Sequence, residues 1–154
     1  NSREDYISLE KEIQWLENYL KLQLLRFDSK FEYHIEIDPN LDIDSIQIPP
    51  MLTQPFIENA LEHGLKSIDY LGKLDILFQI KQDCLLISVS DNGVGLSAAT
   101  KKIQPDDHVS LATTITKERL QFLNQYKRRK IIFDIRDISP KGVSVSFSIP
   151  LKHR

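Results

Sequence analysis

The chain has 154 residues, a length that suits a single domain with a substantial hydrophobic core. Hydrophobic residues make up 41% of it and charged residues 27%, which is the balance of an ordinary soluble globular protein and argues against disorder. The net charge of -2 and the lack of a long basic run argue against a surface that coats nucleic acid or an anionic membrane.

A single cysteine and the absence of long apolar runs narrow the possible classes further. With only Cys84, the chain has neither an internal disulfide nor a metal site built from several cysteines, which fits a reducing compartment. There is no signal peptide and no apolar run of about 18 residues, so we expect the chain as given neither to span a membrane nor to be exported. The basic cluster at 127–130 is interpreted as a solvated helix end, where the helix dipole favours cations.

The first predicted element is a long helix from Glu4 to about Phe27, a segment without Gly or Pro. Its apolar residues recur at spacings close to three and four: Leu9, Ile13, Leu16, Leu20 and Phe27. Such a seam suits a coiled coil or a four-helix bundle. We therefore expect either dimerisation through residues 4–27 or packing of this helix back on the domain.

The rest of the chain mixes short helices with strands. Alternating apolar and polar residues predict strands at 31–37, 46–48, 73–80, 85–91, 130–137 and 143–151. Two further helices are expected, one at 54–64 and one at about 111–126. This order predicts an α+β sandwich with helices on one face of the sheet.

The helix predicted at 54–64, QPFIENALEHG, has two distinct faces. Thr53 is expected to cap its N-terminus, Pro55 fits its first turn and Gly64 ends it. The apolar face is Ile57, Ala60, Leu61 and Leu65. The polar face is Asn59, Glu62, His63 and Lys66.

Asn59 on the polar face is a candidate metal ligand. The neutral carbonyl oxygen of an Asn side chain can complete the octahedral shell of a Mg²⁺ that arrives with a nucleotide. The alternative is an ordinary solvent-exposed helix residue.

A second candidate site is SDNGVGL at 90–96. Asn92-Gly93 is a strong hairpin signal, and a simple type I′ turn is one interpretation. No returning strand is predicted after it, because the segment 92–110 has no hydrophobic periodicity, and so long a loop is usually functional or mobile. In the functional interpretation, Asp91 accepts a hydrogen bond from an exocyclic amine, and Gly93 and Gly95 let the backbone approach a flat ligand.

Together these stretches resemble the LytS-type sensor histidine kinases of the GHKL ATPase superfamily. QPFIENA followed by His63-Gly64 is similar to the N box, and DNGVGL at 91–96 to the G1 box. The opening SLEKEIQWLENYLKLQLLRF resembles the end of the family's dimerisation helix, and KERLQFLN the helix after its ATP lid. The resemblance spans nearly the whole chain.

The resemblance implies a fold, a domain organisation and cofactors. The fold is a two-layer sandwich with a mixed, mostly antiparallel sheet and helices on one face, preceded by a long helix. Residues 1–28 would be the C-terminal part of a dimerisation region, and residues 29–154 the ATP-binding catalytic domain. ATP and Mg²⁺ would be the bound groups.

The resemblance also implies roles for individual residues. Asn59 would bind the Mg²⁺, Asp91 would hold the adenine amino group, and Gly93, Gly95 and Leu96 would belong to the same nucleotide site. His63 could approach the phosphates, although a helix-surface histidine is the alternative. Glu58, beside Asn59, is the carboxylate to test as a catalytic base.

The sequence departs from the family pattern in two places. In SLATTITKERL, Ser110 and Ala112 stand at glycine positions of the phosphate-binding G2 box, so the grip on phosphate is expected to be altered. The four histidines, His34, His63, His108 and His153, lie outside the context of the family's phosphoacceptor, so this chain is not expected to phosphorylate itself.

The preferred interpretation is the catalytic part of a two-component kinase. It would pass the ATP γ-phosphoryl group to an upstream histidine, for relay to a response regulator. It would be a cytoplasmic domain of an inner-membrane sensor, homodimeric through its first helix, with its own phosphoacceptor region as partner. The alternatives are a nucleotide-sensing or partner-binding module that has lost transfer, and a protein-interaction domain with an empty pocket.

Overall fold

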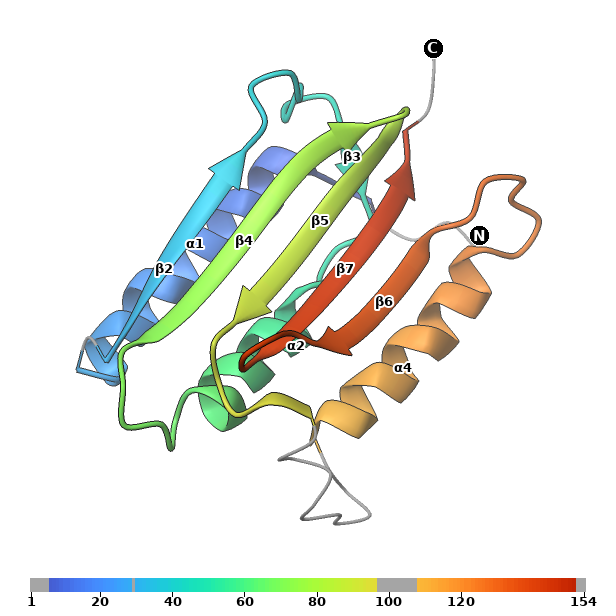
Figure 1. Cartoon of the computed structure of the whole chain (residues 1–154). Helices are drawn as coiled ribbons and strands as arrows, with labels where there is room; N and C mark the ends of the chain where they lie inside the picture. Colours follow the sequence, from blue (N-terminus) through green and yellow to red (C-terminus); the bar gives the residue numbers. More distant parts are fainter. Residues whose placement is uncertain (1–5, 29, 97–107, 152–154) are drawn as a thin grey trace.

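The computed structural model describes residues 6–28, 30–96 and 108–151, and in this part of the chain a five-stranded open sheet carries the fold (Figure 1). Across the sheet the strands are β2 (Phe31–Ile37), β4 (Gly72–Lys81), β5 (Cys84–Asp91), β7 (Val143–Pro150) and β6 (Ile132–Asp137). β2 runs parallel to β4, and the other three neighbouring pairs are antiparallel. The predicted mixed, mostly antiparallel sheet is therefore confirmed.

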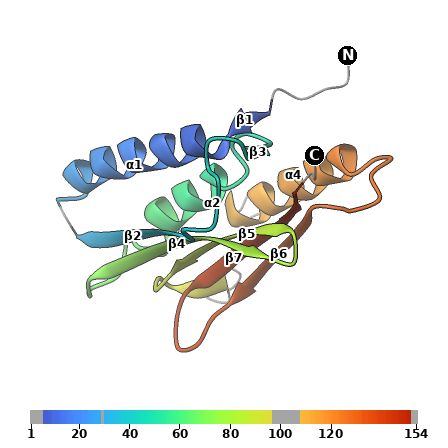
Figure 2. The same ribbon diagram turned by 90° about the horizontal axis from the view of Figure 1, so that it is seen from above.

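In the described part of the chain, helices cover one face of this sheet (Figure 2). They are α1 (Leu9–Arg26), α2 (Gln54–Asn59) with its continuation η1 (Ala60–Gly64), and α4 (His108–Leu123). The opposite face of the sheet is open (Figure 2). This is the α+β sandwich with helices on one face that the sequence predicts.

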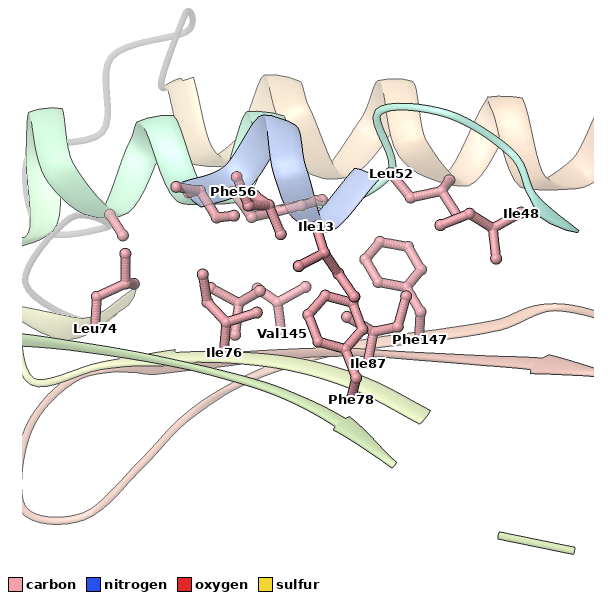
Figure 3. Close-up of a cluster of buried hydrophobic side chains, with 14 of the residues drawn as sticks. Ile13, Ile48, Leu52, Phe56, Leu74, Ile76, Phe78, Ile87, Val145 and Phe147 are labelled. Carbon is pink, nitrogen blue, oxygen red and sulfur yellow. The ribbon is translucent and has the colours of Figure 1, made fainter. Parts of the chain in front are cut away.

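The core lies between the helices and the sheet (Figure 3). Alternation along each central strand puts the apolar side chains on the helix-facing side, because successive side chains point to opposite faces. The buried strand residues are Leu74, Ile76, Phe78, Leu85, Ile87, Val89, Val145, Phe147 and Ile149. From the helix side, Phe56 of α2 packs its ring 5.3 Å from that of Phe133 and 6.2 Å from that of Phe147.

The first helix begins later than the sequence pattern predicts. It starts at Leu9 and not at Glu4, because Ser8 caps it: its hydroxyl accepts the backbone N–H of Lys11 at 3.2 Å. Before the helix, β1 (Ile7–Ser8) pairs with the short strand β3 (Gln47–Ile48). Residues 1–5 lie outside the described part.

The apolar seam of α1 packs back on the domain, one of the two arrangements expected for it. Its members Leu9, Ile13, Leu16 and Leu20 are at most 5% exposed. Leu22 and Leu25, by contrast, are 64% and 78% exposed. Dimerisation and a domain boundary after residue 28 stay predictions.

The second helix differs from the expectation at its start. Thr53 occupies the N-cap position, as predicted, but its side chain makes no capping bond: its backbone is already helical, and its buried hydroxyl has no hydrogen-bond partner. The predicted end at Gly64 is confirmed, but the last turn is a π-helix in which Leu65 N–H donates to the carbonyl of Ala60 at 2.8 Å. The predicted apolar face of Ile57, Ala60, Leu61 and Leu65 is buried throughout.

The helix expected at about 111–126 is α4, which is shifted towards the N-terminus by one turn at each end. The basic cluster at 127–130 lies beyond the end of α4 at Leu123, and the last turn of α4 contains no basic residue, so the interpretation of the cluster as a helix end is wrong. Lys130 Nζ instead donates to the carbonyls of Asn124 and Lys127 at 3.1 and 2.8 Å, in the turn that follows the helix. Within the described residues, no helix combines the length and apolar character needed to cross a membrane.

Candidate functional site

A cleft opens between the end of the second helix and the strand ends beside it. Its polar side chains are Asn59, His63 and Asp91. Apolar residues make up most of the remaining wall: Phe56, Ala60, Val89, Val94, Leu96, Ile135, Val143 and Val145. This lining, mostly apolar with a few convergent polar groups, is typical of small-molecule sites.

Asp91 is a buried carboxylate in this cleft. It is the last residue of β5 and is 8% exposed. Its Oδ1 accepts the N–H of Gly93 at 2.8 Å. Burial raises the pKa of the Asp91 carboxyl, and the backbone N–H groups of Gly93 and Val143 oppose the rise. A carboxylate in such a place favours a ligand that can donate a hydrogen bond to it.

Asn59 and His63 reach the same cleft from the helix. Asn59 is the last residue of α2, and His63 lies in the π-helical turn of η1 that follows. Such turns inside helices are frequent at functional sites. The structure thus brings Asn59, His63 and Asp91 together, as the resemblance implies.

Glu58 lies elsewhere. It is exposed and is not among the described residues that line the cleft. Its charge acts on Tyr19 of α1 instead: burial raises the pKa of Tyr19 most, and the charges of Glu58 and Glu62 raise it further. Glu58 therefore faces the first helix, and a role as catalytic base stays a prediction without support from this geometry.

The segment after β5 is not a hairpin turn. Neither Asn92 nor Gly93 is among the described residues with positive φ, which a type I′ turn needs at both positions. The Asn92 side chain accepts the N–H of Lys73 at 2.7 Å and donates to the carbonyl of Leu71 at 3.1 Å, so it joins the loop to β4. The hairpin interpretation is therefore wrong.

The glycines of this segment have different surroundings. A Cβ on Gly93 would lie 2.3 Å from the carbonyl oxygen of Gly64, so Gly93 packs directly against the end of η1. Gly95, with a φ of +83°, lines the cleft together with Leu96. Gly95 is thus the glycine whose backbone faces the open space.

Ser110 and Ala112 both lie in the first turns of α4. Ala112 is buried, is not among the described residues with positive φ, and does not belong to the described lining of the cleft. At this position a side chain therefore causes no backbone strain. The part of these two residues in phosphate binding stays a prediction, and residues 97–107 lie outside the described part.

Sequence reasoning missed two features of the cleft. The first is the apolar wall that the last hairpin contributes through Ile135, Val143 and Val145. In the sequence these residues show only the alternation of an ordinary strand. The second is Asp137, whose Oδ1 accepts the N–H of Leu96. No local signal marks that residue, because its partner lies far away in the sequence.

The fold defines the class: it is the fold of histidine-kinase catalytic domains. The nucleotide-free catalytic domain of histidine kinase ThkA aligns with a TM-score of 0.63 over 96% of this chain and 95% of that chain, at 14% identity. Full-length ShkA in complex with AMPPNP aligns with a TM-score of 0.65 over 99% of this chain and 32% of that chain, also at 14% identity. The GHKL-type architecture expected from the sequence is confirmed.

Sequence similarity points to particular relatives within this class. The chain is 38% identical over 97 residues to sensor protein LytS of Staphylococcus epidermidis, covering 63% of this chain and 16% of that protein. It is 27% identical over 156 residues to LytS of Bacillus subtilis, covering 98% of this chain and 26% of that protein. No protein-family model matches. The resemblance to LytS-type sensor kinases is confirmed, and the chain spans about a sixth to a quarter of the length of these relatives.

Proposed function

We propose that this chain is the ATP-binding catalytic part of a two-component sensor histidine kinase. One observation carries the proposal: Asn59 and Asp91, from a helix and from a strand end, line one cleft whose remaining wall is largely apolar. The similarity to LytS sensor proteins and the shared fold with kinase catalytic domains support it.

The residues of the cleft fit an adenine nucleotide. Asp91 offers a buried carboxylate acceptor to an exocyclic amine, and Val89, Val143 and Val145 offer the apolar surface that a purine ring needs. Asn59 offers a neutral oxygen of the kind that Mg²⁺ prefers, and His63 adds a polar group beside it. Bound Mg-ATP would supply the phosphoryl group, and its Mg²⁺ would neutralise phosphate charge during the transfer.

The chemistry asks mainly for positioning by this chain. In the proposed transfer, the bond between the γ-phosphorus and the ADP oxygen breaks, and a bond from phosphorus to a histidine nitrogen forms. The acceptor imidazole supplies the nucleophile, so the cleft needs no base of its own. The position of Glu58, which is exposed and lies on the α1 side, agrees with a transfer that needs no base in the cleft.

The wider setting is part of the proposal. Residues 1–28 would end a dimerisation region and residues 29–154 would form the catalytic domain of a homodimeric sensor. The phosphoacceptor histidine would lie upstream, a response regulator would receive the phosphoryl group, and the domain would be the cytoplasmic part of an inner-membrane protein.

Calorimetric titration with Mg-ATP and Mg-ADP tests the nucleotide site. We expect Asp91→Asn to weaken the binding of both nucleotides about a hundredfold, because an amide has one acceptor oxygen where the carboxylate has two. If that oxygen keeps the bond from Gly93 N–H, an NH₂ donor faces the amine of the ligand. We expect Asn59→Ala to make binding insensitive to magnesium. Asp75→Asn and Asn18→Ala, exposed residues outside the cleft, serve as matched controls.

Transfer to a supplied dimerisation and phosphoacceptor domain tests the activity. Labelled phosphate on the acceptor histidine would support the kinase. Binding of neither nucleotide by the folded parent chain would refute the nucleotide site, and binding without transfer would leave a nucleotide-sensing module.

A further inference from the structure

The segment 93–96, which leaves β5 and passes along the cleft, is held by backbone hydrogen bonds to three different elements. They are Gly93 N–H to Asp91 Oδ1 of β5 at 2.8 Å, Val94 N–H to the Gly64 carbonyl of η1 at 3.1 Å, and Leu96 N–H to Asp137 Oδ1 of β6 at 2.5 Å. The first two belong to the site described above. The third comes from a residue to which the proposed nucleotide site assigns no part.

Asp137 is well placed to act as an anchor. It is the last residue of β6, and its backbone is paired with Val143 of β7, so its position is set by the sheet. Its side chain reaches across to the backbone N–H of Leu96, which lines the cleft. A hydrogen bond from an N–H to an ionised carboxylate is stronger than one between neutral groups.

The neighbouring Gly95 shows how close the contact is. A Cβ on Gly95 would lie 3.0 Å from Asp137 Oδ1, tighter than an ordinary contact. The φ of +83° at Gly95 also belongs to the region that favours glycine. The backbone at 95–96 therefore rests directly on the Asp137 carboxylate.

We propose that Asp137 is a positioning residue for nucleotide binding, which fixes the Gly95 and Leu96 side of the cleft through the N–H of Leu96 without lining the cleft itself. This inference rests on the proposed nucleotide site. If the cleft wall is ordered before the ligand binds, binding loses no free energy in ordering it. If the wall is loose, part of the binding free energy is spent on ordering it, and the affinity falls. Loss of the anchor should therefore weaken binding even though no described cleft residue is changed.

The test combines backbone amide exchange, measured residue by residue by NMR, with calorimetric titration of Mg-ATP on the full 154-residue chain. For Asp137→Ala we expect exchange at Leu96 to become about tenfold faster and Mg-ATP to bind about tenfold more weakly, the loss of one charge-assisted hydrogen bond. Asp137→Asn keeps an oxygen acceptor, so both quantities should stay within about threefold of the parent.

Asp134→Ala is the matched control. Asp134 is a second exposed carboxylate on β6, it pairs with Arg136 at 2.9 Å, and it does not line the cleft. Its removal should change neither exchange at Leu96 nor nucleotide affinity. Protection of the core amide of Ile87 reports that each variant is folded; if Asp137→Ala loses that protection, Asp137→Ser, whose hydroxyl is too short to reach Leu96, takes its place with the same expected losses.

Two results would overturn the inference. One is unchanged exchange at Leu96 in the folded alanine variant, which would mean that the anchor does not hold the segment. The other is faster exchange at Leu96 with parental affinity, which would mean that the segment is anchored without consequence for binding. A parent chain that binds no Mg-ATP would instead refute the proposed function, and the absence of parental binding distinguishes that case.

Discussion

Two glycines beside Asp91 differ in how much space surrounds them. A Cβ on Gly93 would lie 2.3 Å from the backbone oxygen of Gly64, and neither backbone can move without opening the junction of β5 and η1. A Cβ on Gly64 would lie 3.5 Å from Asp91 Oδ1, which is ordinary contact. The same substitution should therefore have different effects at the two positions.

We expect Gly93→Ala to lower the free energy of unfolding by about 2 kcal/mol, as overpacking of a close contact does. Gly64→Ala should change it by less than about 1 kcal/mol, since alanine is the better helix former. Urea denaturation of the two variants measures the difference. Equal losses of stability would show that the close packing of Gly93 on Gly64 does not constrain the fold.

Gly64→Ala also offers a way to narrow the cleft in a folded protein. The added methyl group would face the Asp91 carboxylate, which we propose holds the adenine amine. We therefore expect about tenfold weaker Mg-ATP binding, the effect of a misplaced methyl group in a tight site. Calorimetry on the folded variant measures this affinity. If the variant bound Mg-ATP as tightly as the parent chain, the purine would not lie against Asp91.

At the scale of elements, a buried carboxyl joins the first helix to its neighbours. Glu12 of α1 is 2% exposed, and its Oε2 has no hydrogen-bond partner. Burial raises the pKa of Glu12 above its ordinary value of 4.5, and the N–H of Met51 and the charge of Arg119 oppose the rise. The folded chain thus binds this proton more tightly than the unfolded chain, and the resulting stabilisation is fully present below pH 4.5 and lost as pH rises through the raised pKa.

Glu12→Gln imitates the protonated carboxyl. We expect it to raise the free energy of unfolding by about 1 kcal/mol at neutral pH, because it removes the cost of a buried charge. Near pH 4.5 and below the advantage should shrink towards zero, since the parent is then protonated too. Denaturation curves across this pH range test it, with the exposed Glu118→Gln of α4 as control. A glutamine variant less stable than the parent at neutral pH would show that Arg119 compensates the charge fully.

Elements with a regular pattern could be predicted from the sequence, and irregular turns could not. Alternation along the strands from β2 to β7 follows from burial of one face, so their existence and nearly their bounds were predictable. The start of α1 was missed because the apolar spacing gives no sign of the strand pairing at Ile7, although Ser8 is a recognisable cap. The π-helical turn after Asn59 leaves the spacing of apolar residues almost unchanged, so nothing in the sequence marks it.

At the scale of the whole molecule, the first helix is part of the core. Leu9, Ile13, Leu16 and Leu20 are each nearly fully buried. Burial of such side chains contributes about 1.5–3 kcal/mol each, and the total is comparable to the stability of a whole domain. A chain lacking residues 1–27 should therefore fail to fold, as measured by circular dichroism and thermal melting.

A matched pair of leucines on the same helix separates folding from association. Leu16 is fully buried and Leu22 is 64% exposed. We expect Leu16→Ala to cost about 3 kcal/mol and Leu22→Ala less than about 0.5 kcal/mol. If the chain lacking residues 1–27 still folded, the first helix would not be needed for the core and could act only in dimerisation.

The candidate site was predictable only in part, because its residues carry different amounts of local information. Asn59 and Asp91 stand in the motifs QPFIENALEHG and DNGVGL, whose chemistry can be argued from residue type. Asp137 is one of many exposed acidic residues, and its contact with Leu96 exists only once β6 has paired with β7, which in turn pairs with β5. Long-range contacts of this kind depend on the order of strands in the sheet, and no local pattern in the sequence marks that order.

The open sheet described above has two outer strands, β2 and β6, whose unpaired backbone groups could recruit a strand from another molecule. Both strands carry charges along their solvent side: Glu32 and Glu36 on β2, and Asp134 with Arg136 on β6. Pairing with a further strand would crowd these charges and strip their water. The sheet edges thus protect the protein against aggregation at high concentration.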